Sequence, residues 1–206
     1  LLILGKLKKM LPEGNELPRN YYETKKMMRT LGLAEEKIHA CVNHCMIYYG
    51  EYAELSHCPE CHHPRYKEKT KSKVPHKVLR YFPLTPRLRR LYNCRETAKN
   101  MIWHSDNPQK NVIEHPSDSE CWKTLNSSFP SFAAEKRNVV VGLSSDDFNP
   151  HGRGKDYSCW PVMVTPYNLP PALYNKRQYN LLTLLIPKPT HTRKHIDVYF
   201  RPLIDD

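Results

Sequence analysis

Three apolar runs in the last third of the chain predict consecutive β-strands. The first run, residues 139–143, joins three β-branched residues to Gly and Leu and stops at the polar stretch 144–147. The second and third runs cover residues 159–165 and 179–186, and a Pro-Pro turn lies between them. Short β-branched and aromatic runs that end at turn residues are typical of buried strands. The pattern therefore predicts a three-stranded β-meander.

Apolar positions three and four residues apart predict helices in the N-terminal part of the chain. The leucines of residues 4–11 predict a first helix, which the Pro and Gly of residues 12–15 end. Asn20 is suited to cap a second helix, because Glu23 three residues later completes a capping box. Gly32 is suited to end that helix.

Further helices are predicted after residue 84. Thr85 followed by Pro86 is a typical helix start, and another helix is expected over residues 96–103. A short helical piece is expected to begin near Cys121. Close to the end of the sequence, Asp197 is expected to cap a helix with apolar positions at helical spacing. Helices and strands that fall in separate stretches indicate an α+β fold.

The chain contains seven cysteines, and four of them form one tight cluster. The odd total and the clustering argue against a secreted domain held by disulfides and favour a metal site in a reducing compartment. Cys41 and Cys45 form one pair, and Cys58 and Cys61 form the other, with twelve residues between the pairs. Each pair is expected in a tight turn, and a hairpin over residues 46–52 is expected to bring the two turns around one tetrahedral ion.

Zn²⁺ is the ion that four thiolates at this spacing favour, ahead of an iron–sulfur cluster. Four protein ligands leave no open position for a substrate, so the predicted role of the ion is structural. Two alternatives stay open. The thiols could be unrelated buried cysteines, or a neighbouring histidine could replace one sulfur. The neighbouring histidines are His44, His57, His62 and His63.

Positive charge is concentrated in one segment of the chain. Lys and Arg outnumber Asp and Glu by 32 to 21, which gives a net charge of +11. Residues 65–90 contain ten basic residues and one acid, Glu68, so this segment alone carries +9. Such a segment predicts a polyanionic partner, above all nucleic acid; the alternatives are a solvated linker or a localisation signal. The residues expected to bind DNA are Lys67, Lys69, Lys71, Lys73, Lys77, Arg80, Arg87, Arg89 and Arg90.

Two adjacent carboxylates, Asp146 and Asp147, follow the first predicted strand. A carboxylate at the end of a rigid strand is a common way to place a metal ligand, because the open end of the sheet leaves room for an ion and a substrate. The alternative is that both aspartates only solvate a loop. Spacing alone leaves both interpretations open.

Membrane insertion and secretion are not indicated. No run approaches the roughly 18 apolar residues that a membrane span requires. Residues 1–9 do not have the order of a signal peptide, because their basic residues follow the apolar ones. The chain begins without Met and stops inside a predicted helix, so we expect a piece of a longer protein.

Several blocks of sequence, in order along nearly the whole chain, resemble plant CACTA-type (En/Spm-like) transposases. The most specific block is Leu-Ser-Ser-Asp-Asp-Phe-Asn-Pro at residues 143–150. The other matching blocks are residues 10–14, the four clustered cysteines, residues 81–83, 103–104, 115–116, 160–162, 167–171, 184–186 and 196–203.

The resemblance implies a DDE/D nuclease with a ribonuclease H-like domain, which begins with three strands and a helix. In that family three acidic residues hold two Mg²⁺ or Mn²⁺ ions for attack on a DNA phosphate. Asp146 matches the first of these acids. The second lies on a fourth strand and the third on a later helix, beyond this sequence, so Asp197 is not assigned a catalytic role. The sequence departs from the family at Asp147, where Gly is usual, and at His151, Pro166 and the loop 188–195.

The resemblance divides the α+β chain into five parts. A helical N-terminal part and a zinc ribbon-like module of four cysteines are followed by the first three strands and the start of a helix of an incomplete ribonuclease H-like domain. The expected parts are a helical N-terminal segment at 1–40, the zinc ribbon-like module at 41–64, a basic linker at 65–84, a helical connector at 85–135 and the ribonuclease H-like half-domain at 136–206.

The expected function is that of a nuclear transposase fragment, ancestrally cutting and joining DNA at transposon ends. With only its first acidic ligand, the chain is expected to be inactive alone. Its expected partner is DNA, with self-association or another transposon-encoded protein as further partners and no membrane contact. One alternative is a non-catalytic zinc- and DNA-binding module derived from a transposase. Another is a decayed reading frame whose product does not fold stably, because half a sheet leaves an open edge.

Overall fold

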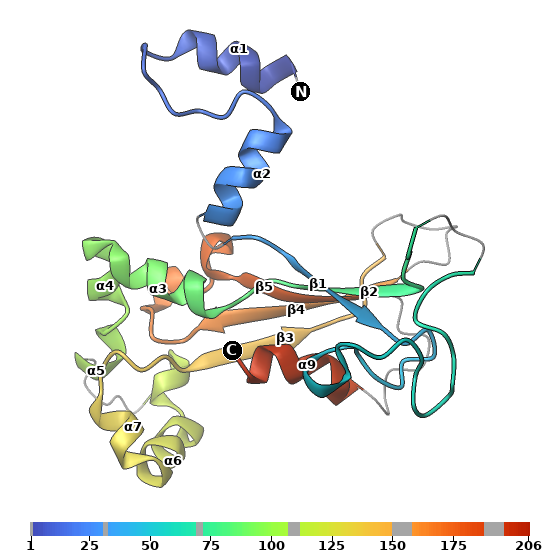
Figure 1. Ribbon diagram of the computed structural model, residues 1–206. Coiled ribbons are helices and arrows are strands. Elements are labelled where there is room, and N and C mark those ends of the chain that lie inside the picture. The colour runs from blue at the N-terminus through green and yellow to red at the C-terminus, as the bar shows by residue number, and fades with distance from the viewer. Residues whose placement is uncertain (1, 31–32, 69–71, 107–111, 150–157, 188–195) are drawn as a thin grey trace.

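The computed structural model describes residues 2–30, 33–68, 72–106, 112–149, 158–187 and 196–206. Its centre is a five-stranded antiparallel sheet with the strand order β1-β2-β5-β4-β3 (Figure 1). The predicted meander is confirmed, because β3, β4 and β5 pair in sequence order. The strands are β1 Glu36–Ala40, β2 Lys77–Tyr81, β3 Val141–Ser145, β4 Cys159–Pro166 and β5 Leu181–Pro187.

Strands β1 and β2 were not predicted from the sequence. β1 lies in the stretch expected to be helical, which corrects that expectation for residues 36–40. It alternates exposed and buried positions, with Ile38 and Ala40 facing the core. β2 lies within the segment expected to be a basic linker, and its Leu79 and Tyr81 are buried. Both strands are five residues long, so their alternation is too short to stand out from a mixed charged sequence.

The main core lies between the sheet and α9, Ile196–Ile204. Tyr199 of this helix is fully buried among residues of β2, β4 and β5, including Leu79, Val162 and Leu184. α9 packs on β5 and β2. Burying an apolar side chain of this size contributes about 1.5–3 kcal/mol, so α9 and the central strands stabilise each other.

Strand β3 is exposed, which corrects the expectation of a buried strand. It forms the edge of the described sheet, and Val141 and Leu143 have exposed fractions of 39% and 53%. The apolar run is therefore not a core strand. On its other face, Gly142 lies under the Tyr167 ring, which occupies the space that a Cβ atom at residue 142 would need.

Asn168 holds the beginning of β3 in place. Its fully buried side chain accepts a hydrogen bond from the Val140 amide (2.8 Å) and donates one to the Asn138 carbonyl (2.8 Å). The Tyr167 amide also donates to the Val140 carbonyl (2.8 Å). The turn after β4 therefore fixes the start of the strand that Asp146 follows.

The described helices agree in large part with the predicted ones. Asn20 caps the second helix as predicted, because its side chain accepts from the Glu23 amide (3.0 Å). Asp197 lies one residue inside α9, in its first turn, instead of at its cap. Pro130–Ala134, just before the meander, form a short helix. The other helices are α1 Leu2–Met10, α2 Tyr21–Thr30, α3 Thr85–Asn93, α4 Arg95–Asn100, α5 Trp103–Asp106, α6 Glu120–Ser128, α7 Pro130–Ala134 and α8 Pro171–Tyr174, with 3₁₀ turns at Gly50–Tyr52, Pro116–Asp118 and Arg177–Tyr179.

The start of α3 depends on a residue from the far end of the sequence. The Asp206 carboxylate accepts hydrogen bonds from the amides of Leu84 and Thr85 and from the Tyr81 hydroxyl (2.7 Å). A carboxylate at a helix N-terminus satisfies free amides and interacts favourably with the helix dipole. The helix start at Thr85 was predicted, but this capping partner was not.

Candidate metal centre

The four predicted cysteine ligands converge at one point of the structure. The sulfur atoms of Cys41, Cys45, Cys58 and Cys61 all lie within 4.8 Å of one another. Zn–S bonds of about 2.3 Å in a tetrahedron place sulfurs about 3.8 Å apart, and the Cys41 and Cys61 Sγ atoms are 3.4 Å apart. The donor set therefore fits a metal ion such as zinc.

The first turn of the site is closed by backbone hydrogen bonds. The His44 amide donates to the Cys41 carbonyl (3.0 Å), and the Cys41 amide donates to the Met46 carbonyl (2.9 Å). His44 has a φ of 63°, in the left-handed region. Histidine occupies this region more readily than most residues other than glycine. The sharp turn directs both cysteines of the pair to the same side.

The second turn repeats this arrangement. The His62 amide donates to the Cys58 carbonyl (2.9 Å), and the Cys58 amide donates to the His63 carbonyl (3.0 Å). His62 has a φ of 57°. The two turns thus have similar hydrogen bonding although their spacings differ, with three residues between the first two cysteines and two between the second two.

The thiols differ in how readily they ionise. Burial raises the pKa of Cys41 to about 11 and also raises that of Cys45. Burial acts in the same direction at Cys61, but hydrogen bonds from the His63 amide and the Cys41 thiol prevail and lower its pKa to about 6. A metal ion that binds all four as thiolates must displace the remaining protons.

Three of the neighbouring histidines bond through their rings to other groups. The His44 ring bonds through Nδ1 to the Tyr199 hydroxyl (2.7 Å) and through Nε2 to Lys77. His57 Nδ1 lies 3.0 Å from the Ser56 hydroxyl, and His63 Nδ1 lies 3.0 Å from the Pro64 carbonyl. Among the described residues, the one group of three or more convergent ligands consists of the four cysteines alone. The sequence left open a site of three cysteines and one histidine, and the structure favours four cysteines.

The cysteine module, residues 41–76, is an insertion between the adjacent strands β1 and β2. Cys41 directly follows β1, and Lys77, which begins β2, donates to the Val42 carbonyl (3.0 Å). The hairpin expected over residues 46–52 is absent from this described stretch. Ile47 instead forms a single bridge with Ala40, and a 3₁₀ turn follows. The sheet therefore holds both ends of the module.

Arg65 supports the module from within. Its guanidinium donates to His39 Nδ1 (2.8 Å) and to the carbonyls of Leu55 (3.0 Å) and Ala53, and it lies 4.5 Å from the centre of the Tyr48 ring. Arginine suits this position because its planar group can donate several hydrogen bonds and stack on an aromatic ring. This residue of the basic segment is thus structural.

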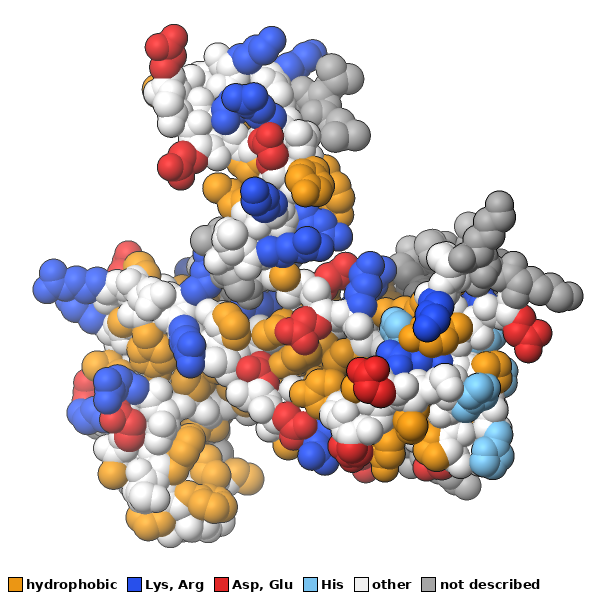
Figure 2. Space-filling model, in the orientation of Figure 1, with side chains coloured by type: hydrophobic (Ala, Val, Ile, Leu, Met, Phe, Trp, Pro, Cys, Tyr) orange, Lys and Arg blue, Asp and Glu red, His pale blue; other side chains and the backbone are white. Residues whose placement is uncertain are grey.

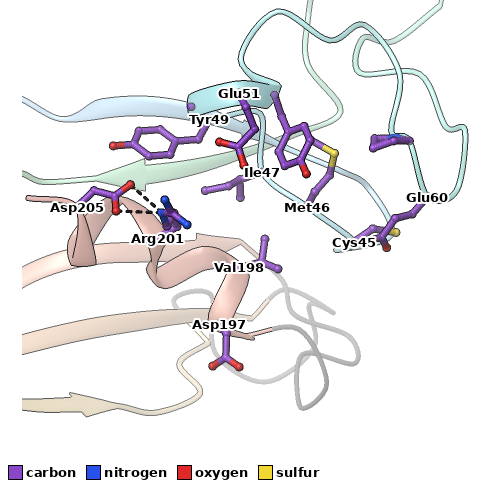
Figure 3. A pocket seen from close by; sticks show the side chains of 13 residues that line it. Cys45, Met46, Ile47, Tyr49, Glu51, Glu60, Asp197, Val198, Arg201 and Asp205 are labelled. Carbon is purple, nitrogen blue, oxygen red and sulfur yellow. Dashed lines mark hydrogen bonds and ion pairs between the residues drawn. The ribbon is translucent and has the colours of Figure 1, made fainter.

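The module and α9 enclose a cleft of about 420 Å³. Met46, Tyr49 and Glu51 of the module line this cleft together with Asp197, Val198, Arg201 and Asp205 of α9. The Arg201 and Asp205 side chains pair across one helical turn (2.9 Å; Figure 3). With the His44–Tyr199 hydrogen bond, this arrangement joins the cysteine site to the main core.

The basic residues predicted to bind DNA differ in exposure and in contacts among those described. Lys67, Lys73, Arg80, Arg89 and Arg90 are exposed. Lys77 bonds to the first cysteine turn, Arg80 pairs with Glu35, and Arg87 donates to the Leu182 carbonyl. Lys69 and Lys71 lie outside the described residues.

The exposed basic residues do not form one patch. Lys67 and Lys73 lie on the loop of the cysteine module, whereas Arg89 and Arg90 lie on α3. Figure 1 shows these two segments at opposite ends of β2. A single duplex contact across this segment would have to span the length of that strand.

Asp146 directly follows β3 and is exposed. Its carboxylate accepts a hydrogen bond from the neighbouring Asp147 amide (2.7 Å). No other acids converge on it within the described part of the chain to form a three-ligand group. The structure thus places Asp146 just after the edge strand and outside any three-ligand group of the described residues.

Comparison with known proteins gives one match. Residues 110–206 match the model of a family described as transposase family tnp2. This match supports a transposase-derived protein, and a transposase family suggests DNA as a partner. It covers α6 to α9 and the meander but not the cysteine site. No curated protein and no solved structure matches the chain, and no described helix is long and apolar enough to cross a membrane.

Proposed function

We propose that this chain is part of a CACTA-type DDE/D transposase and that its own contribution is to bind DNA through a zinc-stabilised scaffold. The observation that carries the proposal is the four-cysteine site, built into the same sheet whose C-terminal strands match a transposase family. The ion in this site is proposed to be Zn²⁺, held by four thiolates in a structural role. The excess of 11 positive charges supports a nucleic acid partner.

The catalytic part of the proposal concerns Asp146. Its resemblance to the first family acid and its place after β3 support a role as one ligand for Mg²⁺ or Mn²⁺ in a ribonuclease H-like domain. Such ions would activate a water or a 3′-hydroxyl for attack on a DNA phosphate. The open edge of β3 suits a further strand, and the resemblance puts the other acids on elements after α9.

Asp146 is the one residue of this chain that matches any of the three family acids, and one carboxylate cannot define the positions of two ions. We therefore expect no DNA cleavage by this chain alone. The test is conversion of supercoiled plasmid to the nicked form with Mg²⁺ or Mn²⁺, comparing the unchanged chain with Asp146→Asn. The proposal expects the same background level of nicked plasmid with the unchanged chain and with Asp146→Asn. Nicking that is lost in Asp146→Asn would show that the chain is itself an active nuclease.

The second candidate function is a non-catalytic zinc- and DNA-binding module, and the isolated position of Asp146 favours it. Under this proposal the chain binds DNA in a salt-dependent manner, and Asp146→Asn binds as well as the unchanged chain. A requirement for Asp146 in DNA binding would contradict this candidate. For either function we propose nuclear action, with self-association or a second transposon-encoded protein as further partners.

A further inference from the structure

A groove lies between α2 and the beginning of the sheet, away from the cysteine site and from Asp146. It measures about 430 Å³. Figure 2 shows Lys and Arg side chains gathered where α2 meets the sheet. The groove is lined by Tyr21, Thr24, Lys25, Met28 and Arg29 of α2, by Leu33, Ala34 and Glu35, by Lys37 of β1, and by Arg80 and Phe82 at the end of β2.

The groove carries an excess of positive charge. Its lining contains four cations but one acid, Glu35. Arg80 forms the close ion pair with Glu35, whereas Lys25 and Lys37 lie at 3.9 and 4.0 Å. The hydrogen bond from Arg80 lowers the pKa of the Glu35 carboxyl, although burial acts in the opposite direction. One carboxylate faces four cations, so three positive charges remain to attract an anion.

The groove also presents aromatic surface next to these charges. Tyr21 lies at its α2 side with an exposed fraction of 66%, and Lys25 Nζ lies 6.0 Å from the centre of its ring. Phe82 lies on the sheet side. α2 buries none of its residues, so the side chains of this helix remain available to a partner.

We propose that this groove binds an unpaired DNA strand, with phosphates on Lys25, Arg29 and Lys37 and a base on Tyr21. Basic grooves with exposed aromatic rings are the usual surface for single strands, because every unpaired base has a face that can stack. Bases inside a duplex already stack on one another, so the ring favours the unpaired strand over a duplex. The proposal rests on the proposed DNA-binding function and gives it a location outside residues 65–90.

The main test removes the three groove cations together. Binding of the full chain to a fluorescent single-stranded oligonucleotide is measured at several salt concentrations for Lys25→Ala/Arg29→Ala/Lys37→Ala. Arg80 is kept because it pairs with Glu35. The plot of the logarithm of the association constant against the logarithm of salt concentration should become shallower. Its negative slope should lose about 2 in magnitude, since each of the three single-strand phosphate contacts contributes about 0.7. Affinity at low salt should fall about tenfold or more.

A matched control removes the same charge elsewhere. Lys9, Lys26 and Lys99 are exposed and do not line the groove. The Lys9→Ala/Lys26→Ala/Lys99→Ala variant should keep most of the affinity and a steeper salt slope than the groove variant. If both variants lose the same affinity, general charge explains the binding and the groove proposal is wrong.

The aromatic part is tested with two adjacent tyrosines. Tyr21→Ala should weaken single-strand binding about fivefold or more, whereas Tyr21→Phe should not. Tyr22 is also exposed but does not line the groove, so Tyr22→Ala should have little effect. Equal losses in Tyr21→Ala and Tyr22→Ala would overturn the stacking role.

The outcomes separate the two proposals. If the unchanged chain binds neither single-stranded nor duplex DNA, the proposed function and the groove proposal both fail. If it binds DNA but the groove variants bind like their controls, only the groove proposal fails. If the groove variants lose duplex binding and keep single-strand binding, the groove holds a duplex and the proposed occupant is wrong.

Discussion

The cysteine site and the end of β3 were both predicted as metal-binding positions, and the structure presents them very differently. The four cysteines converge from a stretch of 21 residues and are buried or half-buried. Asp146 is exposed and joins no convergent group among the described residues. The difference shows that a site whose ligands are close in sequence can be complete within one module, whereas a carboxylate site built from distant elements depends on all of them.

The largest expected effect is loss of the metal site. Cys58 is fully buried in the cluster, and Cys58→Ser should reduce zinc from about one ion per chain to a small fraction, because structural zinc sites depend on all their ligands. The module should also become sensitive to protease. Zinc is measured by elemental analysis and cleavage by limited proteolysis.

The control for this change is Cys94→Ser, because Cys94 is exposed and outside the cluster. It should leave zinc content and protease resistance unchanged. Full zinc content in Cys58→Ser would contradict the assignment of four cysteine ligands and remove the contrast between the two regions.

The next effect concerns the anchor of β3. Asn168→Ala leaves the Val140 amide without its side-chain partner and should cost about 1–3 kcal/mol in unfolding free energy. The measurement is urea unfolding, with Asn175→Ala at the exposed end of α8 as the control. Zinc content should not change, because the anchor lies outside the cysteine module. If Asn168→Ala unfolds no more easily than Asn175→Ala, the anchor is not what places β3.

A smaller effect is expected at Gly142. Gly142→Ala places a methyl group where the Tyr167 ring lies, and the ring must move at a cost of about 1–2 kcal/mol. The loss of unfolding free energy caused by Gly142→Ala should be largely absent in a chain that also carries Tyr167→Ala. A double-mutant cycle, which compares the two single variants with the double variant, measures this difference. Additive effects of the two substitutions would show that the ring does not restrict residue 142.

The smallest effect is expected at Asp146. Asp146→Asn changes an exposed side chain and should alter unfolding free energy by less than about 0.5 kcal/mol. Zinc content should also stay the same. A large destabilisation by Asp146→Asn would indicate that this residue has structural partners. Asp146 would then no longer differ from the buried cysteines in its contribution to the fold.

Much of the architecture could be predicted where the signal is local. The meander follows from three apolar runs bounded by turn residues, and α2 follows from the capping box at Asn20. The cysteine cluster follows from short spacings that place two sulfurs in each turn. In these cases the residues that determine the structure lie within a few positions of one another.

The errors fall where burial and pairing depend on distant segments. The Val-rich run 139–143 looks like a core strand, yet β3 is an exposed edge because α9 packs on β2 and β5. β1 and β2 are short and charged, and their pairing with each other and with β5 makes them strands. Local propensity is a weak determinant of short strands, and tertiary pairing overrides it.

The same distinction applies to the candidate sites. The nine predicted basic residues were chosen for charge alone, and the structure shows that Lys77, Arg80 and Arg87 bond within the protein. The groove beneath α2 was missed because it forms only where α2 and β1 meet Arg80 and Phe82, which lie about 40 residues further along the chain. No spacing rule brings those segments together.

The sequence by itself therefore determined the cap of α2 at Asn20, the clustering of the four cysteines and the order of the meander. The tertiary structure decided which face each strand buries, that the cysteine module is an insertion in the sheet, and which cations face solvent. The physical reason is that hydrogen bonding and turn geometry act over a few residues, whereas burial and charge depend on the segments that fold against them.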